Sequence, residues 1–345
     1  MKFDAMLLDY KLDQVADYTK AVEAAGFDGL VLGEAKTDPF PGLTLVAEHS
    51  KKLNLGPGIA VAFARSPGTL AYLGWNLAEY SKGRFIMGLG TQVRAHNERR
   101  FGVKWEKPVK KMRETILAMR AFWDCWQNGT PFRYRGEFFN LKLMAPFFNP
   151  GPHDYPDVPV YIAAVNKMML QLSGEICDGT YLHALHTVPY IKEFALPHIH
   201  AGAEKAGRNP DDIKVCTGIF VIPTDEAELA AKTEDFIREQ LSFYMSTPAY
   251  RVVMEIHGWE EIGFKLSKAV RRAKYEEMKS LITDEMLDEV TVSGTWAELP
   301  GKIHTKYGNL LDRVSYYLPY TPGENEDGWR ATIEGIKKTQ KPGGE

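Results

Sequence analysis

Three side chains in the sequence are candidates for moving protons: Glu34, His96 and His183. A carboxylate or an imidazole can act as a general acid or base when its surroundings tune its pKa. Burial of Glu34 would raise its pKa into a range suited to acid-base catalysis. The equally good alternative is that Glu34 is a loop carboxylate in a salt bridge, without a role in catalysis. If Glu34 takes part in the chemistry, we expect Glu34→Gln to reduce turnover and to leave the affinity for any cofactor nearly intact.

His183 and His186 lie three residues apart, directly after a short apolar run. That spacing occurs in metal sites, but no cysteines or carboxylate pair accompany the two histidines, so we predict no metal site. In a barrel, the end of a strand is where catalytic and cofactor-contacting groups lie, which makes His183 a candidate. A partly buried, hydrogen-bonded histidine is the alternative.

Two backbone features point to a bound cofactor or anion. The run LGPGIAV at residues 55–61 places two glycines and a proline in an expected strand, which weakens a strand unless its backbone is unusual there. At residues 163–167 (AAVNK), an expected strand ends in small residues directly before a helix. The free amides and positive dipole end of that helix form an anion or phosphate site. The run GLGT at residues 88–91 is no dinucleotide fingerprint, because Val93 stands where that motif needs its third glycine.

The elements that must position these groups alternate between apolar runs and amphipathic stretches. Strands are expected at residues 3–8, 29–32, 55–63, 84–89, 158–163, 180–182, 214–222 and 313–318. Helices are expected at residues 12–25, 43–52, 68–81, 112–126, 167–177, 188–206 and 296–307. This pattern predicts an α/β protein with a (β/α)8 TIM barrel, and a doubly wound open sheet is the other economical topology.

We expect one barrel domain over residues 1–322 with two insertions. The first, at about 131–157 after strand 4, contains an expected hairpin flap at 132–143. The second, at about 225–290 in the seventh βα unit, is charge-rich and expected to be helical throughout. Both insertions are expected to shape a substrate pocket, and residues 323–345 to form a loosely attached C-terminal tail.

The composition excludes several classes of protein. Among 345 residues, 42 Lys and Arg nearly balance 45 Asp and Glu, so no overall field favours nucleic acid or an anionic membrane. The three cysteines are far apart, which argues against a disulfide framework. Asp4 and Asp9 precede any apolar run long enough for a signal peptide, and no later segment approaches 18 uncharged apolar residues. We therefore expect neither a signal peptide nor a membrane span. We predict a cytoplasmic protein that acts on a small molecule.

Six segments, in this order, resemble the bacterial luciferase-like monooxygenase superfamily, and most closely its members that use the deazaflavin coenzyme F420. They are AAGFDGL at residues 24–30, LGPGI at 55–59, RSP at 65–67, SKGRFIMGLG at 81–90, PVYIAA at 159–164 and SGEICDG at 173–179. Together they span most of residues 1–190. The rest of the chain matches loosely, at residues 291–307 and 312–318.

The resemblance implies a TIM barrel whose third strand carries a non-prolyl cis peptide behind the flavin-like ring. Gly58-Ile59 matches that position. It also implies a set of residues that hold the ring, side chain or phosphate of the cofactor: Gly58, Ile59, Ala60, Thr91, Asn97, Ala164, Val165, Asn166 and Lys167. The related enzymes suggest a homodimer.

Two departures from the family pattern stand out. The family commonly has Gly-Pro where this chain has Asn166-Lys167, and asparagine tolerates the left-handed backbone that glycine allows. The deazaflavin-dependent sugar-phosphate dehydrogenases carry an acidic residue followed by a catalytic histidine after strand 2, whereas Glu34 is followed here by Ala35. That departure counts against the sugar-phosphate dehydrogenase reaction.

The leading hypothesis is an oxidoreductase that transfers a hydride between coenzyme F420 and a small organic substrate at the C-terminal mouth of the barrel. One alternative is a monooxygenase of the same superfamily that uses reduced FMN and needs a separate flavin reductase; oxygen consumption would identify it. A second is a non-catalytic flavin-binding barrel, which Ala35 keeps open and which would bind cofactor without turnover.

Overall fold

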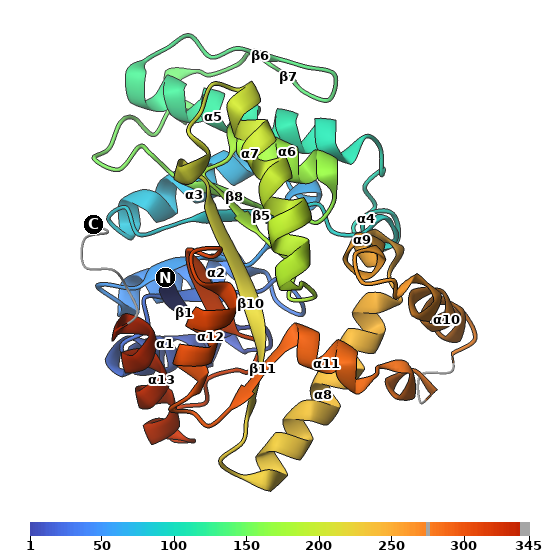
Figure 1. Cartoon of the computed structure of the whole chain (residues 1–345). Coiled ribbons are helices and arrows are strands. Elements are labelled where there is room, and N and C mark those ends of the chain that lie inside the picture. The colour runs from blue at the N-terminus through green and yellow to red at the C-terminus, as the bar shows by residue number, and fades with distance from the viewer. Residues whose placement is uncertain (274–276, 339–345) are drawn as a thin grey trace.

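Short apolar runs bounded by glycine, proline and polar residues form a parallel sheet at the centre of the protein (Figure 1). The computed structural model describes residues 1–273 and 277–338. The central strands are β1 (Lys2–Leu7), β2 (Gly29–Leu32), β3 (Asn54–Pro57), β4 (Ala60–Val61), β5 (Met87–Gly90), β8 (Val160–Ala163), β9 (Gly179–Tyr181), β10 (Lys214–Pro223) and β12 (Arg313–Tyr316). They lie in the order β3-β2-β1-β12-β10-β9-β8-β5-β4, and the neighbours pair in parallel.

The two ends of this sheet meet and nearly close the barrel. The N–H of Leu55 in β3 donates to the carbonyl of Arg84 (3.1 Å), and the N–H of Ile86 donates to the carbonyl of Leu55 (2.8 Å). This closure confirms the predicted (β/α)8 barrel class and rules out the open sheet. The single strand expected at 55–63 is divided: β3 and β4 flank the Gly58–Ile59 peptide bond, which is cis as the resemblance implied, and Ala62–Ala64 form a 3-10 turn.

Helices surround the sheet, as the alternating pattern predicted (Figure 1). They are α1 (Leu12–Ala25), α2 (Pro39–His49), α3 (Pro67–Tyr80), α4 (Arg94–Arg99), α5 (Pro108–Asn128), α6 (Lys167–Ile176), α7 (Leu196–Lys205) and α12 (Leu299–Tyr307). Local signals set their ends. The Ser66 hydroxyl accepts the N–H of Thr69 (3.1 Å) at the start of α3, and Gly129, with φ of 70°, ends α5. A π-helix at Tyr190–Ala195 precedes α7 within the helix expected at 188–206.

The first insertion forms the expected hairpin, with β6 (Tyr134–Arg135) antiparallel to β7 (Asn140–Leu141). The second insertion contains α8 (Ala227–Met245), α9 (Arg251–Glu255), α10 (Glu260–Arg271) and α11 (Asp284–Val290). The sequence reasoning missed a strand directly after it, β11 (Thr291–Gly294), which pairs in parallel with the end of β10.

The expectation of a loosely attached tail is wrong for residues 326–338. These residues form α13 (Glu326–Lys338), whose Trp329, Ile333 and Ile336 are buried. The Trp329 ring packs against Phe27 (5.9 Å between ring centroids) and against Tyr316 (5.7 Å). Burial of three large apolar side chains on one helical face holds α13 on the barrel. Residues 339–345 lie outside the described part of the chain.

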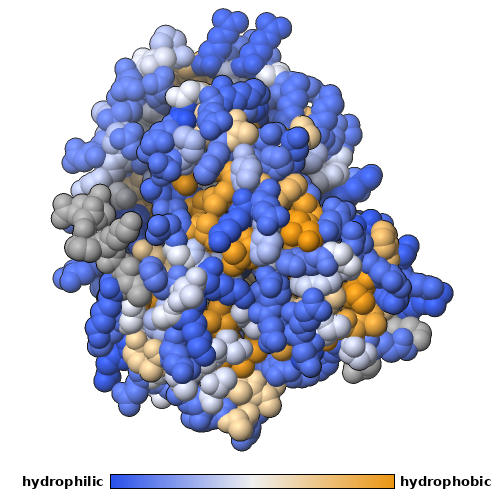
Figure 2. Space-filling model, in the orientation of Figure 1, coloured by the Kyte–Doolittle hydropathy of each residue, from blue (hydrophilic) through white to orange (hydrophobic). Residues whose placement is uncertain are grey.

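A buried ion pair crosses the barrel interior. The Arg313 guanidinium donates to both Asp4 carboxylate oxygens, at 2.8 and 2.6 Å, and to the Asn54 side-chain oxygen at 3.0 Å. The surface in Figure 2 is mostly hydrophilic, with apolar side chains gathered in patches over the middle of the view. Within residues 1–273 and 277–338, no helix has the length and apolar character needed to cross a membrane.

Candidate active site

A cavity of about 1060 Å³ opens at the C-terminal ends of the barrel strands. Its walls come from the segments after β3, β5, β8 and β9, from β1, β10 and β12, and from the second insertion at residues 248–252 and Glu255. The insertion thus shapes the cavity, as expected. The flap at 132–143 does not line it, so that part of the expectation is wrong.

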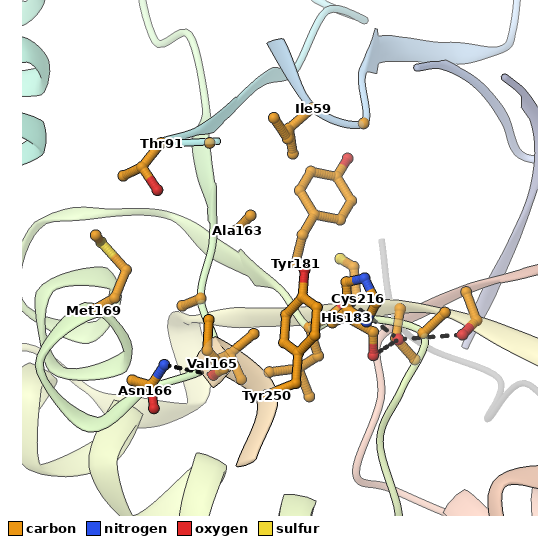
Figure 3. Close-up of a pocket in the computed structure, with 18 of the residues that line it drawn as sticks. Ile59, Thr91, Ala163, Val165, Asn166, Met169, Tyr181, His183, Cys216 and Tyr250 are labelled. Carbon is orange, nitrogen blue, oxygen red and sulfur yellow. Dashed lines mark hydrogen bonds between the residues drawn. The ribbon is translucent and has the colours of Figure 1, made fainter. Parts of the chain in front are cut away.

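Two glycines create the space next to the Gly58–Ile59 peptide. A Cβ at Gly58 would overlap the Val31 side chain, and a Cβ at Gly90 would overlap the side chain of Ile59. Gly58 and Ile59 both line the cavity, whereas Ala60 is fully buried in β4. In Figure 3, Ile59 lies on the same side of the pocket as Thr91, across from His183. The structure therefore brings together two of the three residues expected in this strand.

The segment between β8 and α6 forms the next wall, through Ala164, Val165, Asn166 and Lys167. Asn166 is the N-cap residue of α6, but its side chain makes no capping hydrogen bond; its amide group donates instead to the carbonyl of Ala249 in the insertion (2.9 Å). The first amides of α6 therefore lack a side-chain cap. Asn166 has φ of −99°, so its tolerance of a left-handed backbone is not used here.

The loop after β5 is held by a buried asparagine. The Asn97 amide group donates to the carbonyls of Thr91 (2.8 Å) and Val93 (3.1 Å). Thr91 lines the cavity, whereas Asn97 lies behind the loop and outside the lining. Asn97 therefore fixes the shape of this wall from outside. His96 is exposed on α4 and also lies outside the cavity lining, so the structure does not place it with the other candidates.

Glu34 is part of a structural ion pair. Its carboxylate accepts the N–H of Val61 (2.8 Å) and a guanidinium N–H of Arg65 (2.7 Å), and Arg65 also contacts Asp38. Glu34 lies outside the cavity lining. Of the two interpretations of this residue, the structure favours the salt-bridged carboxylate over a proton donor or acceptor.

His183 is the one candidate for proton handling that lines the cavity. Its ring stacks on Tyr250 (4.2 Å between centroids), and its Nδ1 accepts the N–H of Leu185 (3.0 Å). Burial, with a smaller effect of His186, lowers the pKa of His183 to about 3, so the ring is neutral near pH 7.

His186 faces away from the cavity. Its Nδ1 lies 3.0 Å from the carbonyl of His183, and its Nε2 lies 3.1 Å from the hydroxyl of Tyr307. Burial lowers the pKa of His186 to about 4. Within residues 1–273 and 277–338, no group of three His, Cys, Asp or Glu side chains is arranged to bind a metal ion.

Sequence reasoning missed several side chains that complete the cavity. Tyr250 and Arg251 come from the second insertion, Tyr317 follows β12, and Tyr181 and Cys216 point inward from β9 and β10. Tyr181 and Cys216 are visible in the alternation of their strands, which predicts every second residue to face the interior. Tyr250 and Arg251 carry no such signal, because only the path of the insertion brings them to the cavity.

Comparison with known proteins identifies the family. The model described as luciferase-like monooxygenase matches residues 1–313. The chain belongs to the luciferase-like monooxygenase family. An uncharacterised protein of Mycobacterium tuberculosis (strain ATCC 25618 / H37Rv) is 40% identical over 329 residues, which are 95% of this chain and 96% of the relative. A 5,10-methylenetetrahydromethanopterin reductase of Methanolobus tindarius is 30% identical, with 87% of each chain covered.

Solved structures of luciferase-like proteins share this fold. The coenzyme F420-dependent tetrahydromethanopterin reductase of Methanopyrus kandleri matches with a TM-score of 0.78 at 22% identity, covering 98% of each chain. The resemblance drawn from the sequence motifs is thereby confirmed. This luciferase-like barrel belongs to a superfamily of oxidoreductases and monooxygenases, which supports an enzyme.

Proposed function

We propose that this luciferase-like protein is an oxidoreductase that transfers a hydride between coenzyme F420 and a small organic substrate. One observation carries the proposal: a single cavity joins Gly58–Ile59, Thr91 and the start of α6. Each of these three walls is a place where the family resemblance puts a different part of the cofactor. The name of the relative at 30% identity, a methylenetetrahydromethanopterin reductase, adds support for reductase chemistry.

The residues present fit such a cofactor. A volume of about 1060 Å³ is at the upper end of the range of small-molecule sites and has room for a three-ring system together with a small substrate. A Cβ at Gly90 would overlap the Ile59 side chain, so glycine at this position leaves room for Ile59. This space supports the ring position that the family resemblance implies. At the other end, the uncapped amides of α6 and the Lys167 ammonium suit a phosphate.

When bound, the deazaflavin supplies the hydride donor or acceptor for the reaction. The chain itself contributes binding and orientation. Ile59 would support the ring, and the start of α6 would bind the phosphate. The Asn166–Ala249 hydrogen bond ties this phosphate site to the insertion that carries Tyr250. Apolar and aromatic walls exclude water from the reacting groups, which strengthens the electrostatic contacts there.

Fluorescence titration of the cofactor-free protein with F420, oxidised FMN and reduced FMN tests the proposal. We expect F420 to bind more tightly than either form of FMN, and alcohols, aldehydes and enones are then the substrates to screen. Preference for reduced FMN together with oxygen consumption would identify a monooxygenase. Tight F420 binding without turnover of any substrate would identify a non-catalytic barrel.

A matched pair of variants tests the phosphate wall. Val165 lines the cavity beside the first amides of α6. Val165→Asp adds a carboxylate there, and its repulsion of the phosphate should raise the Kd for F420 at least tenfold, or about 1.4 kcal/mol. Val165→Asn has nearly the same shape without the charge, so its Kd should rise much less. Equal affinities for the two variants would contradict the placement of the phosphate.

A further inference from the structure

The His183 ring is fixed at the cavity wall by aromatic side chains. Tyr250 stacks on it with 4.2 Å between centroids and 25° between planes, and Tyr244 contacts it edge-on at 4.5 Å and 89°. The Tyr244 hydroxyl is in turn hydrogen-bonded to the Tyr317 hydroxyl (2.5 Å). These contacts come from the insertion and from the segment after β12, and they leave the imidazole little freedom to rotate.

The hydrogen bonds of this ring determine where its proton lies. Nδ1 accepts the N–H of Leu185 (3.0 Å), so its lone pair is in use and it carries no hydrogen. A neutral imidazole must then carry its hydrogen on Nε2. Among residues 1–273 and 277–338, no protein group hydrogen-bonds to Nε2. The protein does not fully enclose this atom either. The Nε2–H group therefore faces the cavity.

The surroundings keep His183 in this neutral form. Burial is the main cause of its low pKa, about 3, and His186 adds to the effect. The two aromatic side chains in contact with the ring are uncharged near pH 7: burial raises the pKa of Tyr250 to about 12, and it also raises the pKa of Tyr244. Asp4 and Glu255 line the same cavity, but no carboxylate among the described residues forms an ion pair with the ring.

We propose that His183 binds the substrate oxygen through its Nε2–H group, and that the substrate is a small ketone or aldehyde, or the corresponding alcohol. This inference rests on the proposed function, which places the cofactor along Ile59, Thr91 and α6 and leaves the His183 side of the cavity for the substrate (Figure 3). In the reducing direction, the carbonyl carbon gains a hydride from the reduced coenzyme. The C=O π electrons move to oxygen, and water supplies the proton.

In this arrangement His183 stabilises the negative charge that develops on oxygen and keeps its own proton throughout. That role differs from general acid catalysis, because the ring donates a hydrogen bond without passing through an imidazolium. Removing one such donor in an enzyme that stabilises an oxyanion lowers kcat by about 100-fold to 1000-fold.

Nitrogen NMR of the cofactor-free protein tests the state of the ring without any activity. In protein labelled with 15N-histidine, and with the signal assigned by comparison with His183→Gln, we expect a neutral imidazole with hydrogen on Nε2 at every pH from 5 to 8. An imidazolium in that range, or hydrogen on Nδ1, would overturn the proposal.

Substitution tests the substrate class, with acetone and cyclohexanone as probes and reduced F420 as the hydride source. His183→Leu should lower kcat/KM about 100-fold, whereas His183→Gln, which retains a side-chain N–H donor, should stay within about tenfold of the unchanged protein. Equal loss in both variants, a His183→Leu value within twofold of the unchanged protein, or turnover of other substrates but no carbonyl compound would overturn it.

F420 titration of the same three proteins separates this inference from the proposed function. Unchanged F420 affinity in both variants locates the defect at the substrate side and supports the inference. Failure of the unsubstituted protein to bind F420 would overturn the proposed function and the substrate role together, while the NMR result would still decide the ring state independently.

Discussion

Glu34→Gln separates a structural role of this carboxylate from a catalytic one. The Glu34 and Arg65 side chains are only 6% and 11% exposed, and Glu34 accepts hydrogen bonds from the N–H of Val61 (2.8 Å) and from Arg65 (2.7 Å). Hydrogen bonds to a charged group stabilise a fold by about 1 kcal/mol more than neutral ones. Two such bonds weakened in the variant should lower the free energy of unfolding by about 2 kcal/mol, or about 30-fold in the folding equilibrium.

Urea unfolding followed by circular dichroism measures this loss, and turnover per folded molecule should change little. Asp38→Asn is the matched control. It affects the exposed end of the same network, where Asp38 is 51% exposed, and asparagine caps α2 as well as aspartate does. We expect it to cost less than about 1 kcal/mol. An unchanged urea midpoint for Glu34→Gln together with a tenfold or greater loss of turnover would refute this reasoning and return Glu34 to the chemistry.

Two further predictions concern the buried polar groups. Arg313→Met leaves the Asp4 carboxylate buried without its partner and should lower the free energy of unfolding by about 3–5 kcal/mol, and adding Asp4→Leu should recover most of that loss in urea unfolding; no recovery would contradict the ion-pair explanation. For His186, the folded pKa of about 4 lies below the ordinary 6.5, so the unfolded chain binds more protons and stability falls as pH drops from about 6.5 to about 4. His186→Asn should flatten this dependence of the urea midpoint on pH, and an unchanged slope would show that other groups cause it.

Much of the architecture could be predicted because it follows from local patterns. Eight apolar runs alternating with amphipathic helices favoured the barrel over an open sheet, and the closure of the sheet decided between them. The family resemblance of the LGPGI motif located the cis peptide at Gly58–Ile59. The helix α13 was predictable as well, since Trp329, Ile333 and Ile336 recur at helical spacing, but its position next to a glycine-rich end suggested a tail. The strand β11 is only four residues long, and its pairing with β10 defines it.

The family and the small-residue turn before α6 could be predicted from the sequence, because each shows in short runs of neighbouring residues. The roles of the individual polar groups depend on the folded chain. Glu34 forms an ion pair with Arg65, which is 31 residues away in the sequence. The His183 ring stacks on Tyr250, which comes from a distant insertion. The pKa and hydrogen-bonding role of a side chain depend on burial and on partners brought together by folding, and residue type and local spacing do not report these.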